Sequence, residues 1–189
     1  MSSPDPRQVI REHLSVPRVV ISETPVPGTH GWRSRQTRGM GADVATIQFL
    51  KERRISRRQV HAVTFTDADA HRMRFTYYLA QDGADNWRVD GAAGGSADGD
   101  PIRATPWANV GGGGWPANFY AGGAVVDNGL DVARMRLIAA NGTIMEDTVD
   151  AGVVLFVTDQ HVELPLQAEL YDRTGQMVAW HGVFERIPR

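Results

Sequence analysis

The stretch Trp107–Gly123, WANVGGGGWPANFYAGG, decides how the rest of the chain is interpreted. It contains six glycines and four aromatic residues, and it separates two segments that are rich in strand signals. Glycine-rich loops bind phosphate through backbone N–H groups when a helix follows them. Here no Gly-Lys-Ser/Thr follows, and no strand–glycine–helix unit is visible. We therefore interpret the stretch as a connection or hinge between two β segments and not as a phosphate loop.

The aromatic side chains of this stretch are the first candidate binding residues. Flat amphipathic rings on an adaptable glycine backbone are typical of recognition loops. Exposed, they would suit a sugar ring, a peptide or another subunit. The simpler alternative is that they pack over the edge of a neighbouring sheet. The four residues are Trp107, Trp115, Phe119 and Tyr120.

The first 40 residues predict a helix, a strand and a loop. Asp5 is a suitable N-cap, and Pro6 stands at the first helical position, where a missing N–H costs nothing. We therefore expect a helix over Pro4–Leu14. A β-branched strand should follow at Arg18–Glu23, and then a loop at Thr24–Gly41 with room for a short edge strand.

A β-meander with short polar turns is predicted from Val60 onward. Val60–Thr66 and His71–Ala80 have strand composition, and an Asp-containing turn separates them. Asp43–Arg54 fits either a helix or a strand, and the strand signal after it favours a hairpin. Gly91–Thr105 is so rich in glycine and alanine that we expect a loop or linker there.

The C-terminal part predicts a second β array. Val132–Ala140 alternates, Asn141-Gly142 is a two-residue hairpin signal, and Gly152–Thr158 reads as a strand buried on both faces. Short strands at roughly one per ten residues suggest a β-sandwich. The pattern resembles an immunoglobulin-like sandwich without its cysteine pair, and this resemblance brings no functional motif.

The predicted fold class is therefore mainly β, or α+β overall. A short N-terminal helix and an antiparallel sheet occupy residues 1–92, and an immunoglobulin-like β-sandwich module occupies residues 120–189. Residues 93–119 form a Gly/Pro-rich connection between them. The two parts could also pack as one unit.

Charge is unevenly distributed along the chain. Residues 1–75 hold 13 of the 20 Lys and Arg and 7 of the 22 Asp and Glu, so this part carries +6 and the remainder −8. Clustered arginines match phosphate geometry and could bind nucleic acid. We favour solvated residues or salt bridges to the acidic part, because no nucleic-acid fold motif accompanies them. The basic residues concerned are Arg33, Arg35, Arg38, Lys51, Arg53, Arg54, Arg57 and Arg58.

Asp67, Asp69 and His71, in the sequence TDADAH, form a candidate metal site. Alternate positions on a strand point the same way, so the three side chains could offer oxygen and nitrogen ligands to one ion. Short Asp-containing connections are also what a hairpin turn uses, and this second interpretation is the one we favour. A metal site here would support a small metal-dependent or hydrolytic enzyme as the alternative function.

No catalytic motif is visible in the chain. It has no cysteine, which excludes disulfides, thiolate catalysis and cysteine-based zinc sites, and it has no H-E-x-x-H or G-x-S-x-G. We expect no cofactor and a non-enzymatic binding or assembly protein. We expect its partner to be another protein or a second copy of the chain, and carbohydrate and nucleic acid are the alternative ligands. No signal peptide is seen and no apolar run approaches the ~18 residues that span a bilayer, so a cytoplasmic location is the default expectation.

Overall fold

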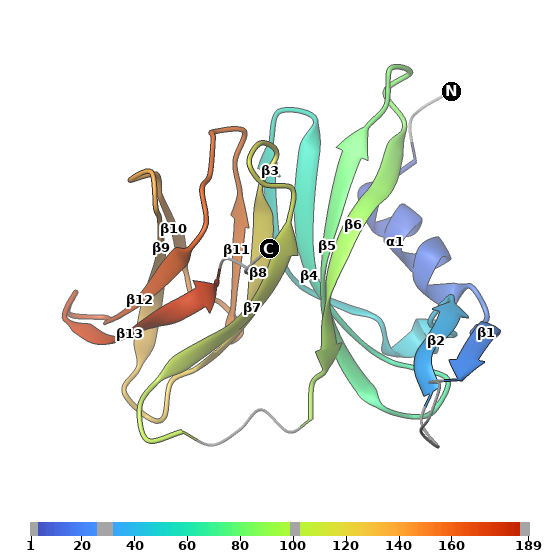
Figure 1. Ribbon diagram of the computed structural model, residues 1–189, viewed down its shortest axis with the longest axis horizontal. Helices are drawn as coiled ribbons and strands as arrows, with labels where there is room; N and C mark the ends of the chain where they lie inside the picture. Colours follow the sequence, from blue (N-terminus) through green and yellow to red (C-terminus); the bar gives the residue numbers. More distant parts are fainter. Residues whose placement is uncertain (1–3, 26–31, 99–102, 186–189) are drawn as a thin grey trace.

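The structure is a computed structural model that describes residues 4–25, 32–98 and 103–185. In these ranges the chain is mainly β, with one short α-helix and antiparallel sheets, which confirms the predicted class (Figure 1). The elements are α1 (Pro6–Ser15), β1 (Val19–Pro25), β2 (Trp32–Arg38), η1 (Val44–Thr46), β3 (Gln48–Ile55), β4 (Arg58–Thr66), β5 (Arg72–Gln81), β6 (Trp87–Ser96), β7 (Trp107–Gly113), β8 (Tyr120–Val126), β9 (Val132–Ala139), β10 (Ile144–Thr148), β11 (Val153–Val157), β12 (Leu166–Asp172) and β13 (Met177–Phe184).

Three stacked sheets and a covering helix make the layers of the molecule. The N-terminal sheet has the strand order β3-β4-β5-β6, the central sheet β11-β8-β7 and the C-terminal sheet β10-β9-β12-β13, while β1 and β2 form a separate hairpin. Figure 1 shows α1 beside β5 and β6, and the central sheet between the other two. The central sheet therefore has a neighbour on each face.

Helix α1 forms where its cap and apolar stripe predict it. The Asp5 side chain accepts a hydrogen bond from the N–H of Arg7, and Pro6 occupies the first helical position. Ile10 and Leu14 are fully buried against the N-terminal sheet, so the helix is held by packing more than by its own short length. Within the described ranges, no helix has the length and apolar character needed to cross a membrane.

The N-terminal sheet is the predicted meander with one extra strand before it and a longer strand after it. Residues 48–55 form β3, which pairs with β4, so the hairpin interpretation of Asp43–Arg54 is confirmed from Gln48 onward, whereas Val44–Thr46 is a short 3-10 helix capped by Asp43. The predicted loop at Gly91–Thr105 is wrong for Gly91–Ser96, which extends β6 along β5. Glycine and alanine are poor strand formers in isolation, but here tertiary packing needs small residues.

The Gly/aromatic stretch is the β7–β8 hairpin, with residues 114–119 as its connecting loop, and not a hinge between two β segments. Strands β7 and β8 pair in register, with Gly111 opposite Gly122 and Gly113 opposite Tyr120. A methyl group placed on Gly122 would lie 2.6 Å from both Leu155 Cδ2 and Thr76 Oγ1. The glycines therefore let the central sheet approach the N-terminal sheet closely.

Both faces of the central sheet are buried, as the strand signal at Gly152–Thr158 predicts. Val153 and Leu155 pack with the N-terminal sheet, whereas Val154 and Phe156 belong to the core shared with the C-terminal sheet. All five residues of β11 are buried. A sheet with a neighbour on each face reads as a continuous apolar run for this reason.

The C-terminal sheet contains the predicted Asn141-Gly142 hairpin in a different turn form. Gly142 has φ +82°, but Asn141 does not have positive φ, so the turn is not the form in which both central residues are left-handed. Instead, the N–H of Gly142 donates to the carbonyl oxygen of Ala139, and the N–H of Ala139 donates to the carbonyl oxygen of Thr143. The immunoglobulin-like identity of the sandwich and the division at residues 93–119 stay predictions.

We expect Gly122→Ala to destabilise the fold and Gly95→Ala to be close to neutral. The first substitution forces a methyl against Leu155 and Thr76, which should cost about 1–3 kcal/mol of unfolding free energy. At Gly95 no atom lies within 4 Å of an added methyl. Urea unfolding of both variants measures the difference, and equal stabilities would contradict the role given to close sheet packing.

Candidate functional site

The four predicted binding aromatics do not form one exposed surface. Trp107, Phe119 and Tyr120 are 6%, 0% and 8% exposed, so the expectation that the Gly/aromatic stretch presents them to a partner is wrong for these three. Trp115 is 44% exposed and is the member that solvent can reach. Partner binding through Trp115 stays a prediction.

The buried rings hold the layers together. Tyr120 stacks on Tyr78 of the N-terminal sheet, with ring centroids 4.6 Å apart and planes 5° apart. Phe119 meets Phe184 of the C-terminal sheet edge-on, with centroids 5.9 Å apart. Adjacent residues of one chain segment therefore anchor the two opposite neighbours of the central sheet.

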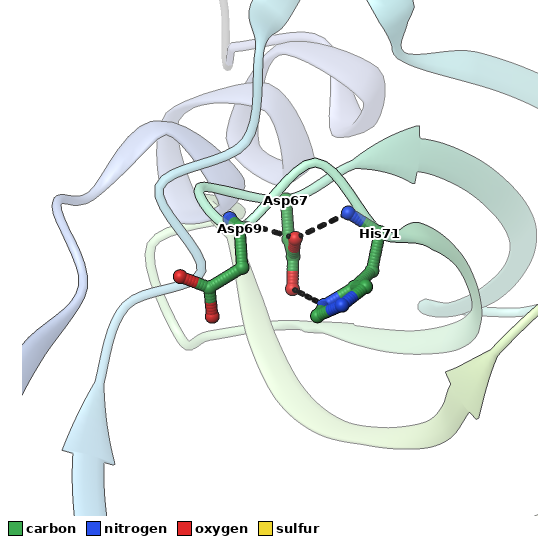
Figure 2. Close-up of side chains that lie close together, drawn as sticks. All are labelled: Asp67, Asp69 and His71. Carbon is green, nitrogen blue, oxygen red and sulfur yellow. Dashed lines mark hydrogen bonds and ion pairs between the residues drawn. The ribbon is translucent and has the colours of Figure 1, made fainter.

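The predicted metal ligands come together at the turn between β4 and β5. One possible metal-ligand atom from each of Asp67, Asp69 and His71 lies within 4.8 Å of the others. Figure 2 shows the three side chains at the turn. Oδ1 of Asp67 accepts the backbone N–H groups of Asp69 and His71, each at 2.9 Å. The Asp67 side chain is 7% exposed, and its hydrogen bonds are those of an Asx-type hairpin turn.

Arg18 already supplies positive charge to this cluster. Its Nη1 forms an ion pair with Oδ2 of Asp69 and lies 3.9 Å from Oδ2 of Asp67. His71 Nδ1 lies 3.7 Å from the same Asp67 oxygen. A metal ion would have to displace the guanidinium, so turn formation accounts for the arrangement and metal binding stays a prediction.

Asp67→Ala should destabilise the protein much more than Asp69→Ala. The first change removes the largely buried carboxylate that accepts two backbone N–H bonds of an exposed turn, at a cost of about 0.5–1.5 kcal/mol for each bond. Asp69 is 54% exposed, so its ion pair with Arg18 should contribute under about 1 kcal/mol. Chemical denaturation measures both. A melting temperature that rises with added Zn²⁺ and loses this rise in Asp69→Ala would contradict a purely structural role.

The basic residues are distributed among several partners. Arg57 pairs with Asp85 at 2.7 Å, and Arg54 lies over the Trp87 ring at 5.5 Å. Arg58 is half-buried at the start of β4. Arg33, Arg35 and Arg38 belong to β2, and their side chains lie outside the described part of the chain. Nucleic-acid binding by the whole set stays a prediction.

Two of these residues join the basic and acidic parts of the chain. Lys51 Nζ lies 2.7 Å from Asp147 Oδ2 and 2.8 Å from Asp150 Oδ2, and Arg53 Nη1 lies 3.3 Å from Asp147 Oδ1. Lys51 and Asp147 are only 11% and 9% exposed. The predicted contact between oppositely charged parts is confirmed for these residues.

Three histidines have a lowered pKa, although only His61 is buried, whereas His181 is half-buried and His13 is exposed. Burial lowers the pKa of His61, against an opposing effect of Glu52, and also lowers the pKa of His13 and His181. Nε2 of His181 lies 3.2 Å from the N–H and 3.3 Å from the carbonyl oxygen of Ala108 in β7. The folded protein therefore favours the neutral imidazoles.

Stability should fall as the pH drops below about 6.5, the unfolded-state value for histidine. Between that pH and the lower pKa of the folded histidines, the unfolded chain binds protons that the folded chain does not, so the free energy of unfolding decreases. The decrease ends at the pH where the folded imidazoles are protonated as well. Urea unfolding at pH 7.5 and 5.5 measures the change. His181→Gln should reduce it, and a wild-type protein equally stable at both values would contradict the expectation.

A cleft of about 270 Å³ lies between the N-terminal and central sheets. Glycines of β6, β7 and β8 are among the residues that line it. Its polar side chains are few, and close sheet packing already accounts for its glycines. The residues that matter for its shape are Arg74, Thr76, Ala93, Gly95, Asn109 and Gly122.

The outer face of the C-terminal sheet carries a surface that sequence reasoning missed. We call it the Trp180 face. It centres on Trp180 of β13, whose side chain is 65% exposed, the highest value among the exposed large hydrophobic residues described. The cross-strand register places its members side by side. They are Arg134, Arg136 and Ile138 of β9, Ile144 and Glu146 of β10, Gln167, Glu169 and Tyr171 of β12, and Trp180 and Gly182 of β13.

An ion-paired network lies beside the exposed indole. Arg136 contacts Oε2 of Glu146 through Nε and Nη2 at 3.2 and 3.0 Å, and this hydrogen bonding holds the pKa of Glu146 below its usual value. The Tyr171 hydroxyl donates to Glu169 at 2.5 Å, which raises the pKa of Tyr171. Arg134 lies over the Tyr171 ring at 4.4 Å. These polar groups are therefore held in fixed positions.

A shallow groove of about 320 Å³ runs along one end of this face. Trp180, Ile138 and Gln167 line it, and Gly182 contributes no side chain. The alternation in Gln176–Phe184 was a usable signal for a strand. It could not tell which side of that strand faces solvent, because the phase is set by pairing with β12.

Comparison with protein-family models, with curated proteins and with solved structures finds no match to this chain. The contacts within the described residues are therefore the basis for a functional proposal.

Proposed function

We propose that this chain is a non-enzymatic binding module whose contact surface is the Trp180 face. The observation that carries the proposal is the 65% exposure of Trp180 beside a groove and an ordered polar network. Burying a large apolar side chain is worth roughly 1.5–3 kcal/mol. The fold leaves that free energy unused, and a partner could gain it.

The composition of the face also supports binding. Tryptophan, tyrosine and arginine are the residue types that contribute most to binding energy at contact surfaces. Trp180, Tyr171 and Arg136 supply all three types on neighbouring strands. Because the network fixes Arg136 and Tyr171 before any partner arrives, little side-chain entropy remains to be lost on binding.

The enzyme alternative near Asp67, Asp69 and His71 has weaker support. Two backbone N–H groups use Oδ1 of Asp67, and Arg18 contacts both carboxylates. The groups that would have to act on a substrate are therefore engaged in holding a turn. This leaves the binding proposal as the one with an available surface.

Trp180→Ala should weaken binding at least about tenfold, the equivalent of about 1.4 kcal/mol. The measurement is retention of the purified protein on three immobilised probe classes, namely neutral glycans, peptides and a second copy of the chain. Leu130→Ala is the control, since it removes another exposed apolar side chain (49% exposed) outside the Trp180 face. Circular dichroism checks that both variants remain folded.

The wild-type protein should bind at least one class, and Leu130→Ala should bind it equally. Indistinguishable behaviour of wild type and Trp180→Ala on every class would refute the Trp180 face as the contact surface.

A further inference from the structure

We infer that the ligand of the Trp180 face is a neutral carbohydrate, an inference that rests on the proposed function. A sugar ring in its chair form presents C–H bonds on one face and hydroxyl groups around its rim. A flat exposed indole such as Trp180 stacks on the C–H face, while its surroundings must supply hydrogen bonds at the rim. The Trp180 face has both parts.

The hydrogen-bonding part is a row of cross-strand neighbours. Four adjacent strands place four residues side by side, in the order Glu146, Arg136, Glu169 and Trp180. The two carboxylates can accept hydrogen bonds and the guanidinium between them can donate, and the indole ends the row. Each sugar hydroxyl both donates and accepts, and a planar guanidinium or carboxylate can serve two adjacent hydroxyls. The row therefore matches a rim of hydroxyls better than it matches an apolar partner.

Charge on the face favours an uncharged ligand. Arg134 and Arg136 are balanced by Glu146 and Glu169, and Arg136 lies within 3.0 Å of Glu146 and 3.9 Å of Glu169. Binding of a polyanion depends on unbalanced cations that release its counterions. Because the face has no net charge, a nucleic acid or a sulfated glycan would gain no free energy from counterion release there. A neutral sugar does not depend on counterion release.

The groove provides room for the chain to continue beyond the stacked ring. Gly182 lies next to Trp180 along β13 and opposite Gln167. A methyl group added to Gly182 would meet only Glu185 Oε1, at 3.9 Å, so the space beside the indole is open. Gln167 and Ile138 line the groove, offering an amide and an apolar wall to a second sugar unit.

A second copy of the chain fits this face less well. A stable dimer buries about 800 Å² on each partner around an apolar centre depleted of charge. Here the centre holds Arg136, Glu146 and Glu169, while the exposed apolar residues Trp180 and Ile144 lie on opposite edge strands. The face is thus built for a small ligand with many hydroxyls.

Calorimetric titration of the full chain with neutral oligosaccharides tests the inference. The probes are cellohexaose, maltohexaose, laminarihexaose and N-acetylated chitohexaose, with heparin as the polyanion and a neutral peptide as the protein-like probe. At least one neutral oligosaccharide should bind. Its Kd should change less than about twofold between about 50 and 500 mM NaCl, because no net charge is involved.

Two variants probe the two parts of the site. Trp180→Ala should weaken oligosaccharide binding at least about tenfold by removing the stacking surface. Gly182→Leu should weaken it by filling the groove, and the Cβ that it adds would meet only Glu185 Oε1, at 3.9 Å. Leu130→Ala is the control and should leave the Kd unchanged, and melting temperatures confirm that all three variants are folded.

The outcomes separate this inference from the proposed function. If peptide or a second copy binds in a Trp180-dependent manner and no oligosaccharide does, the binding module stands and the carbohydrate inference is overturned. Oligosaccharide binding that Trp180→Ala leaves intact, or heparin binding that exceeds that of the neutral sugars, also overturns it. If no probe distinguishes wild type from Trp180→Ala, both proposals fail.

Discussion

Close contact between the central and N-terminal sheets is the constraint on which the rest of the structure depends. It requires small residues on both sides, since a methyl on Gly122 would overlap Thr76 and Leu155, and one on Gly111 would lie 3.0 Å from Ala93 Cβ. Where the strands carry larger groups, Tyr78 and Tyr120 fill the space as a parallel stack. Protein interiors are packed tightly enough that a single added methyl group is felt. The glycines of β7 and β8 are therefore packing residues.

The same contact brings oppositely charged parts of the chain together. Lys51 from β3 meets Asp147 from β10 at a largely buried position, and Asp147 also accepts the N–H of Leu155 in β11 at 2.7 Å. A buried ion pair adds little net stability, but removing one partner leaves the other charge buried and uncompensated, at a cost of about 3–5 kcal/mol. The pair therefore acts against other arrangements of the three sheets and fixes this one.

The layered arrangement also decides which surface is free to bind. Helix α1 covers the outer face of the N-terminal sheet, and the central sheet is enclosed by its neighbours (Figure 1). The outer face of the C-terminal sheet remains exposed, with Trp180 and the Arg136 network on it. In β13 the alternate residues serve different purposes, since His181 contacts Ala108 of the central sheet while Trp180 faces solvent. The proposed binding surface and the contacts between the layers thus lie on opposite sides of one strand.

Local chemistry in the sequence determined the elements that form by themselves. The Asp5 cap, the Asx turn at Asp67 and the alternation of β9 depend on neighbours a few residues away, and each was predictable. Only the tertiary structure decided that the Gly/aromatic stretch is a hairpin, that three of its rings are buried, and that Trp180 is exposed. Glycine has low strand propensity, and strand phase depends on the partner strand, so neither result is encoded within a short window. The first arises from contacts between residues distant in sequence, such as Thr76 with Gly122, and the second from the register of β13 on β12, which places Trp180 opposite Glu169.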